Sequence, residues 1–161
     1  MVLLCVSGAS VHANLRESVV VVQPNVSAHL VSLYTAMGEY FTSRGNPVLG
    51  AYFKGFAEGG HGSGFAIQVQ PGLNVVVTNR HVAGNAADVR LRVDAEGDRK
   101  LDYPKARVLY VDPLLDIAFI EVPVDAPIPV LKLADQIPAD GTEVWSAGFP
   151  GFMNKPAWQL S

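Results

Sequence analysis

Residues 75–84, Val-Val-Val-Thr-Asn-Arg-His-Val-Ala-Gly, begin as a β-strand and place a histidine where the strand pattern ends. Valine and threonine are branched at Cβ, which restricts their rotamers and suits them to a pleated, half-buried surface. Asn79 and Arg80 interrupt the apolar run, and Gly84-Asn85 is a turn signal. His81 is therefore predicted at a strand end beside a loop, where functional residues are common.

Short strands are predicted on both sides of this stretch. They cover residues 65–70, 74–78, 88–93, 106–111 and 117–122, with turn signals at 71–72 and 95–100. Val89, Leu91 and Val93 alternate with Arg90 and Arg92, so the apolar side chains are expected to point inward. Short strands separated by turns at this spacing predict an all-β sandwich or barrel.

The region before residue 62 is harder to assign. Two apolar runs lie on either side of residues 23–25, and the second, residues 26–35, is predicted as a strand. A helix is the alternative there, because Leu30, Leu33, Tyr34 and Met37 also fit a period of 3.6. Residues 41–62 are predicted as a loop with at most one helical turn, and residues 125–135 as an extended linker.

Composition limits the classes of protein. The chain has 161 residues, 49% of them hydrophobic and 17% charged, and a formal charge of −3. This composition is typical of one globular domain, and the net charge argues against nucleic acid or an anionic membrane as a partner. No apolar run approaches the roughly 18 residues that span a bilayer.

Residues 1–13 are apolar and rich in small residues, and Val11-His12-Ala13 resembles a signal-peptidase site. This pattern predicts export to the periplasm or the outside of the cell. The apolar run is short and no basic segment precedes it, so a buried N-terminal strand in a cytoplasmic protein is the alternative. The single cysteine, Cys5, does not decide the compartment.

A histidine that acts as a general base needs a carboxylate to orient its ring. Asp116 directly precedes the apolar run 117–120, where an unpaired carboxylate would be costly. Asp112 is followed by Pro113 and is predicted in a solvated turn, so Asp116 is the better partner. The alternatives are a structural His81 and an Asp116 that only caps a strand.

No cofactor or metal site is predicted. The glycine-rich residues 59–64 lack the Gly-Lys-Ser/Thr of a phosphate loop and lead into a strand. His29, His61 and His81 do not have the spacing of metal ligands.

Five stretches match one family in one order. They are Gly-His-Gly-Ser-Gly-Phe-Ala-Ile (60–67), the opening stretch (75–84), Val-Asp-Pro-Leu-Leu-Asp-Ile-Ala-Phe-Ile-Glu-Val (111–122), Pro-Val-Leu-Lys-Leu-Ala-Asp (129–135) and Gly-Thr-Glu-Val-Trp-Ser-Ala-Gly-Phe-Pro-Gly (141–151). Together they resemble the first part of a trypsin-like serine protease of the HtrA (DegP) type. Residues 46–56 are similar to the aromatic-rich loop that precedes the Gly-Ser-Gly of that family.

The resemblance implies a chymotrypsin-like double β-barrel, with the first barrel complete and the second truncated. It makes His81 the general base and Asp116 the carboxylate that orients it, in a serine endopeptidase that acts on polypeptides. The implied divisions are a signal peptide (1–13), an N-terminal strand and loop arm (14–60), the first barrel (61–134) and the start of the second barrel (135–161).

The departure from the family is the nucleophile. In the family, the nucleophilic serine lies in the motif Gly-Asn/Asp-Ser-Gly-Gly. No such motif occurs in the 161 residues of this chain. Ser63 matches the first strand of the family, Ser146 is predicted within a strand, and Ser161 is the last residue. We therefore expect this chain to be the N-terminal part of a longer protease and to be inactive on its own. The alternatives are a non-catalytic barrel that binds an extended peptide or protein partner, and a structural periplasmic or surface protein.

Overall fold

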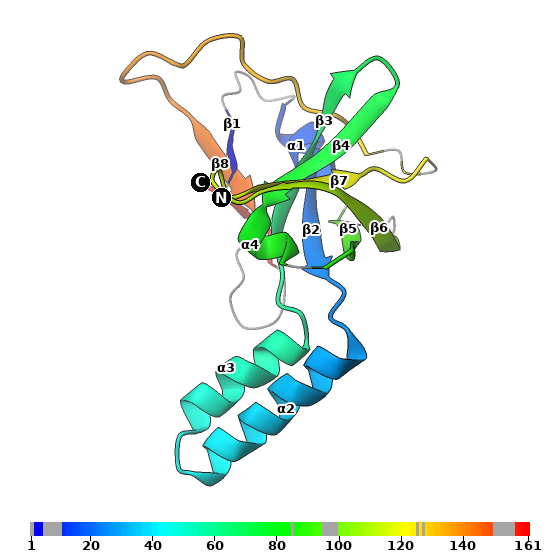
Figure 1. Cartoon of the computed structure of the whole chain (residues 1–161). Coiled ribbons are helices and arrows are strands. Elements are labelled where there is room, and N and C mark those ends of the chain that lie inside the picture. Colours follow the sequence, from blue (N-terminus) through cyan, green and yellow to red (C-terminus); the bar gives the residue numbers. More distant parts are fainter. Residues whose placement is uncertain are drawn as a thin grey trace.

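The computed structural model describes residues 2–4, 11–84, 86–94, 100–124, 126, 128–149 and 157–161. Figure 1 shows a β-barrel, a small sheet beside it, and a pair of helices that projects from the barrel. The barrel is closed, with strand order β2-β3-β4-β7-β6-β5, and all its pairings are antiparallel. Its strands are β2 (Val19–Pro24), β3 (Gly62–Gln70), β4 (Leu73–Asn79), β5 (Asp88–Asp94), β6 (Lys100–Asp112) and β7 (Ile117–Glu121).

This closed barrel confirms the predicted chymotrypsin-like β-fold, although the helices make the chain mostly β and not all β as predicted. The inward alternation in β5 is also confirmed, since Val89, Leu91 and Val93 are buried in the barrel core. Arg90, between them, is exposed and pairs with Asp102 on the neighbouring strand β6. The burial of every second side chain is what a strand with one face on the core requires.

The second sheet contains β1 (Val2–Leu4), β8 (Trp145–Gly148) and β9 (Gln159–Leu160). It explains why β2 carries four consecutive valines. Val20 and Val22 face the barrel core, whereas Val19 and Val21 pack outside the barrel against Ala147 and the neighbouring Phe149. A strand that is covered on both faces has apolar residues at consecutive positions of its sequence.

Two helices correct the predictions for the N-terminal region. Residues 26–35, predicted as a strand, mostly belong to α2 (Ala28–Ser43), and the predicted loop contains α3 (Pro47–Ala57). Each helix has a cap: the Ser27 hydroxyl accepts from the Leu30 N–H at 3.4 Å, and the Asn46 side chain accepts from the Leu49 N–H at 3.1 Å. Pro47 at the start of α3 is favoured because its fixed φ suits the first helical turn.

The apolar run before α2 is the one that forms a strand, β2, and it belongs to the barrel. The barrel therefore includes a strand that the predicted division assigned to the arm of residues 14–60. Residues Val11–Ser18 form a short helix, α1. Within residues 128–135 of the predicted linker, Leu131 donates its N–H to the Ala66 carbonyl at 2.8 Å, so the segment passes beside β3 at this residue.

Some predicted features lie outside the described residues. These are most of the turn at 95–100, Asn85 of the Gly84-Asn85 turn, and Pro150-Gly151 after β8. In the part of the chain that is described, no helix is both long enough and apolar enough to cross a bilayer.

Candidate active site

His81 lies on α4 (Arg80–Ala83), a single helical turn that follows directly on β4. Ala83 is fully buried. Val82 packs so closely over Gly62 that a Cβ added to Gly62 would lie 2.5 Å from the Val82 side chain. The turn ends at Gly84, whose N–H donates to the Arg80 carbonyl at 2.8 Å. The residues after His81 thus anchor the turn in the barrel and leave the histidine side chain 70% exposed.

Asp116 lies in the turn between β6 and β7. The register pairs Asn79 of β4 with Ile117 of β7, which brings Asp116 beside the start of α4. The Arg80 N–H donates to the Asp116 carbonyl at 3.0 Å. Asp116 has φ +53°, a left-handed conformation that costs free energy for a residue with a side chain. The surrounding hydrogen bonds stabilise this conformation.

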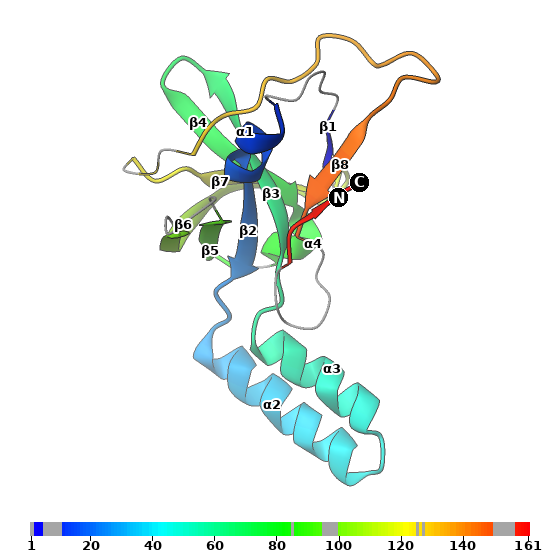
Figure 2. The same ribbon diagram turned by 180° about the vertical axis from the view of Figure 1, so that it is seen from behind.

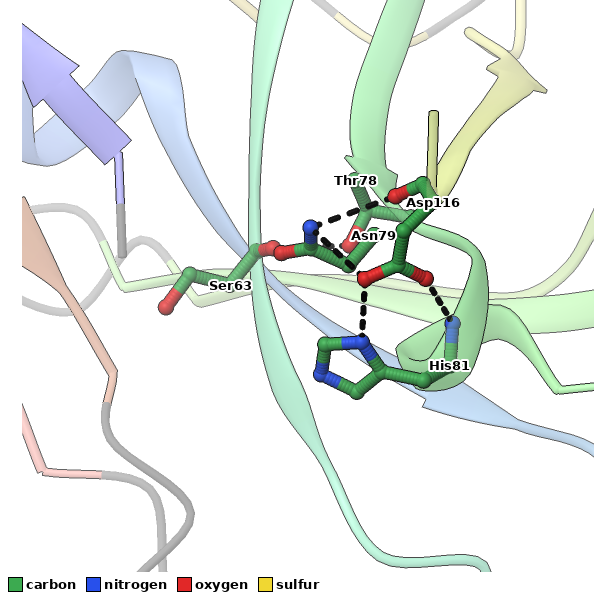
Figure 3. Close-up of polar contacts among 5 residues, drawn as sticks. All are labelled: Ser63, Thr78, Asn79, His81 and Asp116. Carbon is green, nitrogen blue, oxygen red and sulfur yellow. Dashed lines mark hydrogen bonds and ion pairs between the residues drawn. The ribbon is translucent and has the colours of Figure 1, made fainter. Parts of the chain in front are cut away.

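The structure brings the two predicted site residues together, as Figure 3 shows. Asp116 Oδ2 lies 2.7 Å from His81 Nδ1, and Oδ1 accepts the His81 backbone N–H at 3.0 Å. The hydrogen bond from the His81 ring, followed by that from its backbone N–H, holds the pKa of Asp116 below its ordinary value. The carboxylate is therefore ionised at neutral pH.

These contacts select one tautomer of the neutral imidazole. An ionised carboxylate only accepts hydrogen bonds, so His81 Nδ1 must carry the proton that lies between it and Asp116. Nε2 then has a free lone pair, and it points away from the carboxylate (Figure 3). A ring held in this way can take a proton at Nε2 and pass it on.

Asn79 is a third residue of the site, although its place in the sequence predicted only the end of a strand. Its side-chain N–H group donates to Asp116 at two atoms, the carbonyl at 3.2 Å and Oδ2 at 3.3 Å. Asn79 occupies the N-cap position of α4 but does not cap the helix with its side chain. The sequence signal that could have identified Asn79 is a polar residue at a strand end, two positions before a candidate base.

The serines weighed as nucleophiles make hydrogen bonds within the fold, Ser63 through its side chain and Ser146 and Ser161 through their backbones. Ser63 Oγ accepts the Phe149 N–H at 2.7 Å, and the hydroxyl points away from the His81 ring in Figure 3. Ser146 lies in β8, as predicted, and its backbone pairs with that of Ser161 in both directions, at 2.7 and 3.0 Å. Ser63 therefore links the barrel to Phe149, the residue directly after β8.

A cavity of about 1350 Å³ adjoins His81. Val82, Ser63 and Gly148 also line it, and it continues to the base of the helical hairpin, where Tyr34 and Phe56 line its wall. It is large enough for several residues of a peptide. Among the described residues, no three or more side chains of His, Cys, Asp or Glu come together as a metal site would require.

The trypsin-like peptidase domain family matches residues 62–161. This range is more than half of the chain and contains both His81 and Asp116. The chain therefore belongs to the trypsin-like peptidase domain family. No curated protein matched the chain.

The solved structures that are similar to this chain include two proteases. The serine endoprotease from Yersinia pestis has a TM-score of 0.55 and 19% identity, and the match covers 96% of this chain and 44% of that one. The serine protease of human pathogenic astrovirus has a TM-score of 0.48 and 20% identity, with 90% and 60% of the two chains covered. The chain thus spans 44% and 60% of the lengths of these two proteins. The likeness to the Yersinia protein is one of fold.

Proposed function

We propose that this chain is the part of a serine endopeptidase that carries the general base and its orienting carboxylate. The observation that supports this proposal most strongly is the contact of 2.7 Å between His81 Nδ1 and Asp116 Oδ2, which leaves Nε2 as the proton acceptor. Membership of the trypsin-like peptidase domain family supports a polypeptide substrate.

In this mechanism a serine hydroxyl gives its proton to His81 Nε2 as its oxygen attacks the peptide carbonyl carbon. The imidazolium that forms is stabilised by the ionised Asp116, which keeps its own charge throughout. His81 then returns the proton to the leaving amine as the C–N bond breaks, which leaves an acyl-enzyme that water hydrolyses. Asp116 and Asn79 are positioning residues: Asp116 orients the His81 ring, and Asn79 holds Asp116.

We assign the complete peptidase activity to a parent protein that is longer than these 161 residues. No Gly-Asn/Asp-Ser-Gly-Gly occurs in the sequence, and Ser63 is engaged with Phe149. A His–Asp pair without a nucleophile has no acyl-transfer route, so the 161-residue chain alone is expected to be inactive.

We also propose the HtrA type and export from the cytoplasm. The order of the five motifs supports the former, and the apolar residues 1–13 support the latter. N-terminal sequencing of the protein from its producing cells should find a mature chain that begins at Asn14. A chain recovered from the cytoplasm with Met1 intact would contradict export.

A fluorophosphonate probe tests the proposed function, because it labels only a serine activated by a neighbouring base. The parent protein should be labelled, and His81→Ala and Asp116→Asn should lose most of the labelling. His29→Ala is the matched control and should retain it, since His29 lies on α2 and does not line the cavity. Equal labelling of the His81→Ala protein would contradict the proposal. Peptide binding without any labelling of the parent would support the non-catalytic barrel instead.

A further inference from the structure

The two long helices form an antiparallel hairpin inserted between β2 and β3. Figure 1 and Figure 2 show α2 and α3 projecting side by side from one end of the barrel. The base of the hairpin is fastened to the barrel: Gln23 donates a side-chain N–H to the Glu58 carbonyl at 2.9 Å, and the Asn25 N–H donates to the Asp88 carbonyl at 3.2 Å. The hairpin therefore has a defined position relative to the cavity.

The two helices approach closely at two glycines. A Cβ on Gly38 would lie 2.9 Å from the Gly50 carbonyl oxygen, and a Cβ on Gly50 would lie 2.8 Å from that of Gly38. Thr42 donates its hydroxyl to the Gly38 carbonyl at 2.8 Å beside this crossing. Because the backbones nearly touch here, large side chains do not fit between the helices at this level and must lie along their flanks.

Six aromatic side chains make one continuous series of ring contacts, which we call the aromatic ladder. The centroid distances along the series are 5.5, 4.7, 6.0, 5.3 and 5.4 Å. Tyr52 is 60% exposed, Tyr40 54% and Phe56 43%. In order of contact, the ladder comprises Tyr34, Phe56, Tyr52, Phe53, Phe41 and Tyr40.

The ladder is continuous with the His81 cavity. Tyr34 and Phe56, its first two members, line the same cavity as His81, together with Leu30. The 30 residues from 28 to 57 contain only three charged side chains of Asp, Glu, Lys and Arg. One of them, Arg44, lies over the ring of Tyr40 at 5.3 Å. The surface that leaves the cavity is thus aromatic and nearly uncharged.

We propose that the aromatic ladder binds an apolar, aromatic-containing segment of the polypeptide substrate, adjacent to the segment held at His81. This inference rests on the proposed peptidase function, because the shared cavity is what makes one polypeptide reach both places. Tyr and Phe give large contact areas at a small cost in side-chain entropy, and an aromatic side chain of the substrate gains from pairing with an exposed ring. A sparsely charged surface gives little attraction for a charged segment.

Peptide binding to the 161-residue chain tests the inference without any need for turnover. The probes are a fluorescein-labelled peptide that contains Phe and Leu and a peptide of equal length with Ser in their places, followed by anisotropy. The first should bind more tightly, and Tyr52→Ser combined with Phe56→Ser should weaken its binding by about tenfold or more. The matched control is Val48→Ser, on the same hairpin, 80% exposed and outside both ladder and cavity, which should bind like the unchanged chain. Far-UV circular dichroism verifies that the helices persist.

The inference would be overturned if the ladder variant bound the peptide as tightly as the unchanged chain. It would also be overturned if the unchanged chain showed no preference for the aromatic peptide or did not bind it at all. A shift from dimer to monomer in light scattering caused by the ladder variant would overturn it too, because a second copy would then occupy the surface. The weakening caused by the ladder variant should be the same in a His81→Ala background, which separates this test from that of catalysis. If fluorophosphonate labelling fails while ladder-dependent binding persists, only the peptidase proposal fails.

Discussion

Asp116 accepts hydrogen bonds on its carboxylate from the His81 ring, the His81 backbone and the Asn79 side chain. Hydrogen bonds to the charged form of a carboxyl group favour that form. The pKa of Asp116 is lowered for this reason, with the His81 ring as the largest cause. At the scale of single residues, the candidate site is therefore an imidazole held by an ionised carboxylate.

The first prediction concerns the pKa of Asp116. Its carboxyl carbon, followed by NMR, should titrate below the ordinary value of 3.8, and His81→Ala should raise the midpoint. Because the folded pKa is depressed, the stabilisation from this carboxylate is complete above the unfolded-state pKa and is lost as the pH falls through the folded pKa. His29→Ala is the control and should leave the midpoint unchanged. An unchanged midpoint in His81→Ala would contradict the account.

The second prediction concerns Asn79. Asn79→Ala removes two hydrogen bonds to Asp116, and the left-handed backbone of Asp116 then loses part of its support. The free energy of unfolding should fall by about 1 kcal/mol, and the pKa of Asp116 should rise. Urea unfolding together with the NMR titration measures both, and Gln70→Ala, an exposed position on β3, serves as control. A change in stability without any change in the pKa would make Asn79 only a structural residue.

The sequence allowed the pairing of His81 with Asp116 to be predicted, because the end of one strand and the start of another each place a polar side chain at a defined point. It did not reveal Asn79. The amide of Asn79 reaches Asp116 only because β4 and β7 pair in the register that joins Asn79 with Ile117. That register is a long-range property, and no local pattern specifies it.

At the scale of elements, strands with one buried face were predicted well and the helical hairpin was not. In β5 the alternation of Val and Leu with Arg specifies one face. In α2, the run of Leu, Val and Tyr satisfied both a strand and a helix, and the Ser27 cap was overlooked. Residues 41–62 were predicted as a loop with at most one helical turn, whereas α3 is a helix of 11 residues. Its Gly50 is required where the two helices cross.

The third prediction concerns that crossing. A Cβ on Gly50 would collide with Thr42 Oγ1 and lie 2.8 Å from the Gly38 carbonyl, so Gly50→Ala should force the helices apart despite the better helix propensity of alanine. The expected cost is about 1–3 kcal/mol, as for overpacking in a core. Far-UV circular dichroism during thermal unfolding measures it, with Ala51→Ser, exposed on the same helix, as control. Greater stability of Gly50→Ala would show that the helices are not in such close contact.

At the scale of the whole molecule, β2 is buried between the barrel core and the second sheet. Ser63 joins the two parts, because its hydroxyl accepts the Phe149 N–H while its carbonyl accepts the Thr78 hydroxyl at 2.8 Å. Phe149 is buried and packs edge-on against Trp158, with ring centroids 5.4 Å apart. This arrangement gives Ser63 a structural role.

The fourth prediction follows from this role. Ser63→Ala leaves the buried N–H of Phe149 without that acceptor, so the chain should lose about 1–3 kcal/mol of stability. The tryptophan fluorescence of Trp158 should report loosening of the small sheet. Ser32→Ala, on an exposed face of α2, is the control. In the parent protein, Ser63→Ala should keep fluorophosphonate labelling, and loss of all labelling in a folded Ser63→Ala protein would mean that Ser63 is the nucleophile.

The most direct test of the account is the kcat/KM for peptide cleavage by the parent protein and by its His81→Ala variant. The account predicts a loss of at least about 10³-fold, because the base and the nucleophile of a triad act as a unit. Asp116→Asn should also lose activity, since it replaces the ionised acceptor of the Nδ1 proton. A His81→Ala protein that is folded and cleaves peptides as fast as the unchanged parent would contradict the central claim that His81 is the general base.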